Sequence, residues 1–159
     1  MNRKYIGSAL FAMMGGLIGG AVVWKAKKKD EENLKVKSNR NRELMLLLNQ
    51  WLKIKQDNKQ IIDYFHMKKI HAIAIYGMSY VGERLYEELK DSDIEISYGI
   101  DKKWSEIYAD IDVISPEEEL PETDAIIVTP IFFFDEIKDI LSSKVKCPII
   151  SLEDILYEL

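Results

Sequence analysis

The sequence predicts an α/β protein in which residues 70–159 form a five-stranded parallel sheet, preceded by an N-terminal transmembrane helix and an amphipathic helix. Three observations predict this arrangement. Short apolar runs alternate with amphipathic segments after residue 70, residues 5–24 carry no charge, and apolar residues recur at helical spacing between residues 43 and 69. The chain has 159 residues, 47% of them hydrophobic, which is enough for one packed domain.

Residues 1–24 are predicted to be a single-pass membrane anchor. The uncharged segment 5–24 would span about 30 Å as a helix, which matches the hydrocarbon core of a bilayer. Only Arg3 and Lys4 precede it, whereas eight Lys and Arg follow within residues 25–42. The positive-inside rule therefore places the C-terminal domain in the cytoplasm. A cleaved signal peptide is the alternative, although a basic cluster directly downstream opposes export.

A face of small residues recurs every four positions in the predicted anchor, at Ser8, Ala12, Gly16 and Gly20. Small residues at this spacing let two membrane helices approach closely, so the face predicts a homodimer. The alternative is that small residues are simply common in membrane helices.

The charge is divided along the chain. Residues 1–42 hold ten Lys and Arg against three Asp and Glu, a net charge of +7, and residues 43–159 hold twelve against twenty-four, a net charge of −12. An acidic main body argues against a nucleic-acid partner. Residues 25–42 are interpreted as a solvated, basic juxtamembrane linker. With two histidines and one cysteine in the chain, no metal centre is predicted.

Residues 43–69 are predicted to form one amphipathic helix, or two with a break near Asp57 and Asn58. The apolar residues at helical spacing are Leu44, Leu47, Leu48 and Trp51, followed by Ile61, Ile62 and Phe65. Packing against the following domain is the favoured interpretation. A coiled-coil-like or partner-binding stalk is the alternative, for which the repeat is short and irregular.

Five strands are predicted, over residues 70–76, 94–100, 112–114, 125–129 and 148–151. Amphipathic helices are expected after the first strand, over 131–142 and from 152 to the end. A short helix is expected from Ser115, because Ser115 and Glu118 form a capping-box pattern around Pro116. Right-handed crossovers then favour the strand order 3-2-1-4-5, with a ligand crevice at the carboxyl ends of strands one and four.

The turn after the first strand resembles a dinucleotide fingerprint, G-x-G-x-x-G. Gly77 and Gly82 occupy the first and third glycine positions, and Ser79 occupies the second. Asp101 follows Gly77 by twenty-four residues at the end of the second strand, where a carboxylate can accept from ribose hydroxyls. The serine hydroxyl can donate to phosphate or cap the helix. The alternative is that both glycines serve only the turn and helix packing.

The segments 73–103, 121–130 and 147–159 resemble Rossmann-like domains associated with bacterial surface-polysaccharide biosynthesis. This resemblance covers residues 44–159. It implies a relation to the NAD-binding or nucleotide-sugar-binding half of epimerases and dehydratases, some of which occur beside glycosyltransferases. Such domains often carry glycine where Ser79 stands.

These patterns predict a membrane-anchored, non-catalytic module that binds a nucleotide, NAD or a nucleotide-sugar and serves envelope-polysaccharide synthesis, with a glycosyltransferase as the expected partner. The residues predicted to line its crevice are Gly77, Ser79, Tyr80, Gly82, Asp101 and Thr129. One alternative is an NAD-dependent epimerase-like or oxidoreductase-like component that a partner completes. The other is a purely structural adaptor.

Overall fold

The structure is a computed structural model that describes the backbone of residues 3–159 and the side chains of Trp24 and residues 27–159. It contains two compact units, Met1–Met45 and Leu46–Leu159. Helix α1 (Arg3–Gln56) supplies the first unit and continues into the second.

The first unit is helical where the sequence predicted a linker. Residues 25–42 belong to α1, so the helix does not start at Glu43 as expected. This segment contains neither Gly nor Pro and is rich in Lys, a good helix former, which explains how it stays helical without an apolar face. The side chains of residues 27–43 are all exposed, as predicted for a solvated segment. The Lys28 ammonium lies 5.6 Å from the Trp24 ring centroid, one helical turn away.

Among the residues whose side chains are described, no helix is both long and apolar enough to cross a membrane. The predicted membrane segment, residues 5–24, lies outside those residues, apart from Trp24. The predicted dimer face of Ser8, Ala12, Gly16 and Gly20 lies outside them as well.

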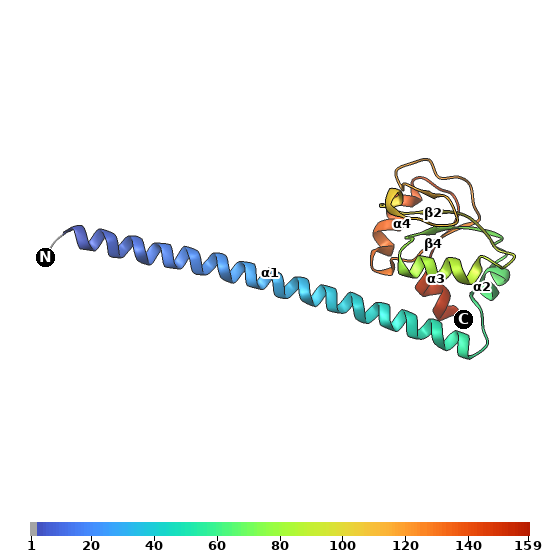
Figure 1. The fold of residues 1–159 in the computed structure, drawn as a ribbon, viewed down its shortest axis with the longest axis horizontal. Helices are drawn as coiled ribbons and strands as arrows, with labels where there is room; N and C mark the ends of the chain where they lie inside the picture. The colour runs from blue at the N-terminus through green and yellow to red at the C-terminus, as the bar shows by residue number, and fades with distance from the viewer. Residues whose placement is uncertain (1–2) are drawn as a thin grey trace. The chain divides into compact units, whose positions relative to one another are not determined.

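The second unit is built around a five-stranded parallel sheet with the predicted strand order, β3-β2-β1-β4-β5. Figure 1 labels two of its strands, β2 and β4. The strands are β1 (Ala72–Tyr76), β2 (Glu95–Ile100), β3 (Val113–Ile114), β4 (Ala125–Val128) and β5 (Ile149–Ser151). Their last residues are paired across the whole sheet: Ile114, Ile100, Tyr76, Val128 and Ser151. The five carboxyl ends therefore meet at one level edge.

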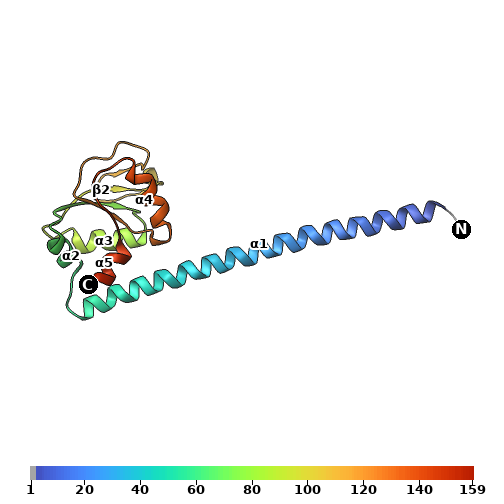
Figure 2. The same ribbon diagram turned by 180° about the vertical axis from the view of Figure 1, so that it is seen from behind.

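Helices cover the sheet from both sides. They are α2 (Ile61–Lys68), α3 (Tyr80–Leu89), α4 (Phe134–Ser142) and α5 (Leu152–Glu158), with short 3₁₀ turns at Trp104–Glu106 and Ile131–Phe133. In both views α4 lies away from α2, α3 and α5 (Figures 1 and 2). On the α4 side, Ile137 and Leu141 join a buried cluster with alternate residues of β1, β2 and β4.

The helix expected from Ser115 is a turn instead. One capping-box bond does form, since the Ser115 N–H donates to Glu118 Oε1 at 3.1 Å, and the Ser115 hydroxyl accepts from the Glu117 N–H at 3.2 Å. A helix cannot extend from this start because Pro121 follows within six residues. The Pro121 carbonyl instead accepts the buried Tyr98 hydroxyl at 2.7 Å.

The amphipathic segment forms two helices, with the break in the predicted place. Helix α1 ends at Gln56, Asn58 adopts a left-handed conformation (φ 58°), and α2 begins at Ile61. Within the second unit, Leu47, Trp51 and Ile54 are buried. The favoured interpretation, packing on the following domain, is therefore confirmed.

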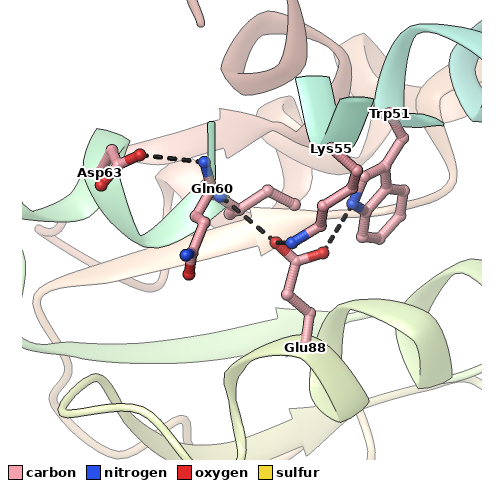
Figure 3. Close-up of polar contacts among 6 residues, drawn as sticks. Trp51, Lys55, Gln60, Asp63 and Glu88 are labelled. Carbon is pink, nitrogen blue, oxygen red and sulfur yellow. Dashed lines mark hydrogen bonds and ion pairs between the residues drawn. The ribbon is translucent and has the colours of Figure 1, made fainter. Parts of the chain in front are cut away.

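Glu88 of α3 joins the end of α1 and the start of α2 to the sheet domain (Figure 3). Its carboxylate accepts from Trp51 Nε1 at 2.7 Å, from Lys55 Nζ at 2.5 Å and from the Ile61 N–H at 3.2 Å. The Glu88 side chain is only 14% exposed, so these donors offset the cost of burying its charge. Residues 46–61 thus form an integral part of the domain.

Candidate functional site

The turn after β1 is shaped by Gly77. Its φ of +91° is a conformation that L side chains rarely adopt, and its N–H donates to the Ile100 carbonyl at 2.8 Å. A Cβ at this position would lie 2.6 Å from Pro130 Cγ and 2.8 Å from Thr129 Oγ1. A glycine is therefore required where β1, β2 and the end of β4 meet.

Gly82 lies in the first turn of α3 and allows the helix to approach this turn. A Cβ at Gly82 would lie 2.1 Å from the carbonyl oxygen of Gly77. Thr129 Oγ1 donates to that same oxygen at 2.6 Å. Thr129, which the sequence predicted to line the ligand crevice, is buried, and its hydroxyl holds the backbone of the turn in place.

Ser79 precedes α3 at the N-cap position and is exposed. Its backbone is extended (φ −86°, ψ −163°), so no glycine is needed here, and its side chain makes no capping hydrogen bond. The first helical bond runs from the Glu83 N–H to the Ser79 carbonyl at 2.9 Å. The N–H groups that precede Glu83 in the first turn of α3, together with the helix dipole, favour an anion at the N-terminus of this helix.

Asp101 follows β2 and braces the turn from the side. Its Oδ2 accepts from the Met78 N–H at 2.9 Å, and its Oδ1 accepts from the Lys103 N–H at 2.8 Å. The sequence predicted a ribose-binding carboxylate at this place, and the fold brings Asp101 beside the Gly77 turn. Each carboxylate oxygen can accept more than one hydrogen bond, so Asp101 retains acceptor capacity.

Three hollows lie around this edge of the sheet. The Ser79 hollow, about 460 Å³, is lined by residues that include Ser79, Tyr80, Asp101, Lys103 and Tyr108. The Arg84 hollow, about 380 Å³, shares Met78, Glu83, Ile107 and Tyr108 with it. The Tyr76 hollow, about 270 Å³, is lined by residues that include Tyr76, Gly77, Asp101, Lys102 and Glu136. Asp101 thus borders both the Ser79 hollow and the Tyr76 hollow.

The Tyr76 phenol keeps its proton at neutral pH. Burial raises the pKa of Tyr76, and the nearby carboxylates of Asp101 and Glu136 raise it further. A neutral phenol in the lining of the Tyr76 hollow can donate one hydrogen bond and accept others.

Sequence reasoning missed Tyr76 and Tyr108 as residues of the site. Tyr76 looked like an ordinary strand residue. The only indication for Tyr108 was an apolar group, Trp104, Ile107 and Tyr108, inside an otherwise polar connection. Among the described side chains, no cluster of three His, Cys, Asp or Glu can hold a metal ion.

Comparison of the chain with protein-family models, curated proteins and solved structures finds no match.

Replacing Gly82 by alanine tests the packing of the turn. The new methyl group would meet a backbone carbonyl that is itself fixed by Thr129, so we expect the free energy of unfolding to fall by about 1–3 kcal/mol. Denaturant unfolding of the full chain measures this. Gly99→Ala is the matched control: its methyl group would meet side chains only, Met78 Cγ at 2.8 Å and Val113 Cγ2 at 3.2 Å, which can shift more readily than a backbone carbonyl, so it should cost less. Equal losses in the two variants would contradict the proposed role of Gly82.

Proposed function

We propose that the chain is a membrane-anchored Rossmann-like module that binds a nucleotide or nucleotide-sugar at the Gly77 turn. The observation that supports this most is the position of the turn, at the carboxyl edge of the sheet where the strand order reverses between β1 and β4. Ser79 at the N-terminus of α3 suits a phosphate, and Asp101 beside it suits a ribose hydroxyl.

We favour binding without catalysis because of where the histidine and cysteine side chains lie. Neither His66 nor His71 lines any of the three hollows, and His66 instead pairs with Asp93 at 3.0 Å. The half-buried Cys147 lines none of them either, and burial raises the pKa of its thiol. A component that uses NAD and depends on a partner for its catalytic groups is the second candidate, favoured by the neutral Tyr76 phenol near Asp101.

The cellular role that we propose follows from the resemblance to polysaccharide-associated domains. The module would recruit or regulate an envelope-glycan enzyme such as a glycosyltransferase at the cytoplasmic face of the membrane. The anchor would hold it there and would offer Ser8, Ala12, Gly16 and Gly20 for self-association.

Substitutions of Ser79 test ligand binding. Calorimetry on the full chain in detergent with NAD, NADP and UDP-glucose should detect binding of at least one of them. Ser79→Glu should weaken that binding roughly tenfold or more, because it places a negative charge where the phosphate would lie. Ser79→Gly, which completes the fingerprint, is the control and should retain binding. Absence of binding to all three compounds would contradict nucleotide recognition and leave the adaptor.

Cell fractionation tests the anchor. The full chain should remain with membranes after alkaline extraction, at its complete mass of 18.5 kDa, whereas a variant that starts at residue 25 should be soluble. Protease should digest the domain in inverted membrane vesicles and leave it intact in right-side-out ones. A shortened chain on the outer side would show that the segment is a cleaved signal peptide.

A further inference from the structure

Two tyrosines around the Ser79 hollow are almost completely exposed. Tyr108, between β2 and β3, is fully exposed, and Tyr80, the first residue of α3, is 85% exposed. They are far apart in the sequence, yet both line the same hollow. A large aromatic side chain left in water forgoes the stabilisation that burial would provide, so a bound ligand that covers these rings would recover it.

The lining of the Ser79 hollow combines groups of different chemistry. Ser79 and Tyr80 lie at the N-terminus of α3, which favours an anion. Met78, Ile107 and Tyr108 provide an apolar and aromatic surface. Its volume, about 460 Å³, falls in the range of ordinary small-molecule sites.

The charged groups of the hollow suit hydroxyl groups on the same ligand. Acceptor oxygens for hydroxyl or amino groups come from Asp101, Glu83 and Glu106. The Lys103 Nζ lies 3.6 Å from Glu106 Oε2. A ligand that matches all three features carries an anionic group, a set of hydroxyls and a flat ring. A nucleoside monophosphate unit has this composition.

We propose that Tyr108 is the platform on which the nucleobase of the ligand stacks. This inference rests on the proposed nucleotide-binding function and deepens it. Tyr108 is chosen over Tyr80 because Tyr80 lies where the phosphate would bind, whereas Tyr108 adjoins Ile107 and borders both the Ser79 and the Arg84 hollow. Stacking on an aromatic ring tolerates different bases, so both purine and pyrimidine nucleotides are expected to bind.

The test is a calorimetric titration of the full chain in detergent with AMP, UMP and glucose 1-phosphate. Tyr108→Ala should weaken the binding of AMP and UMP about tenfold, whereas Tyr108→Phe, which keeps the ring, should bind like the wild type. Tyr157→Ala is the control, because Tyr157 is also exposed (58%) but lies on α5 and lines none of the three hollows. Glucose 1-phosphate, which has no base, should bind more weakly than either nucleotide.

The failures of the two proposals are distinguishable. Equal nucleotide affinity in the wild type and in Tyr108→Ala would overturn the stacking role and leave the proposed function intact. Tight binding of glucose 1-phosphate, equal to that of AMP, would show that the base is not recognised and would also overturn it. A wild-type chain that binds neither AMP nor UMP would overturn the stacking role, and the titrations with NAD, NADP and UDP-glucose would then decide the broader function.

Discussion

The carbonyl oxygen of Gly77 is the point at which the candidate site is held together. It accepts a 2.6 Å hydrogen bond from the buried Thr129 hydroxyl, and α3 passes so close to it that Gly82 has no room for a Cβ. The Gly77 N–H adds a bond to β2 through the Ile100 carbonyl. The ends of β1, β2 and β4 and the start of α3 are therefore fixed around one residue, Gly77, and the geometry of the site follows from this packing.

Contacts within the chain, together with the positive φ of Gly77, explain why glycine is required at these two positions. Any ligand therefore depends on the groups that surround the turn: the exposed Ser79 at the start of α3, the Asp101 carboxylate that braces Met78, and the hollows on either side. Because Asp101 both fixes the loop and keeps acceptor capacity, it couples the shape of the turn to the groups that a nucleotide would meet.

The sequence predicted the sheet well because the alternation of strands and helices, with right-handed crossovers, leaves few topologies. It also predicted that Gly77, Ser79, Gly82 and Asp101 lie close together, since the carboxyl ends of parallel strands share one edge of the sheet. It did not predict the helicity of residues 25–42, which have no apolar face, or the turn at Ser115, where Pro121 prevents a helix. The place of Tyr108 beside the Ser79 hollow, and the hydrogen bonds of Glu88, bring together segments that are distant in the sequence, about which a local pattern carries no information.

The most direct test of nucleotide binding at the Gly77 turn is a residue-by-residue map of the perturbation that a ligand causes. Backbone amide chemical shifts of the full chain in detergent, recorded during titration with NAD and with UDP-glucose, provide it. Nucleotide binding at this edge predicts that the largest changes occur at the amides of residues 78–82 and 101–108. Changes confined to other parts of the domain, or no changes with either ligand, would contradict it.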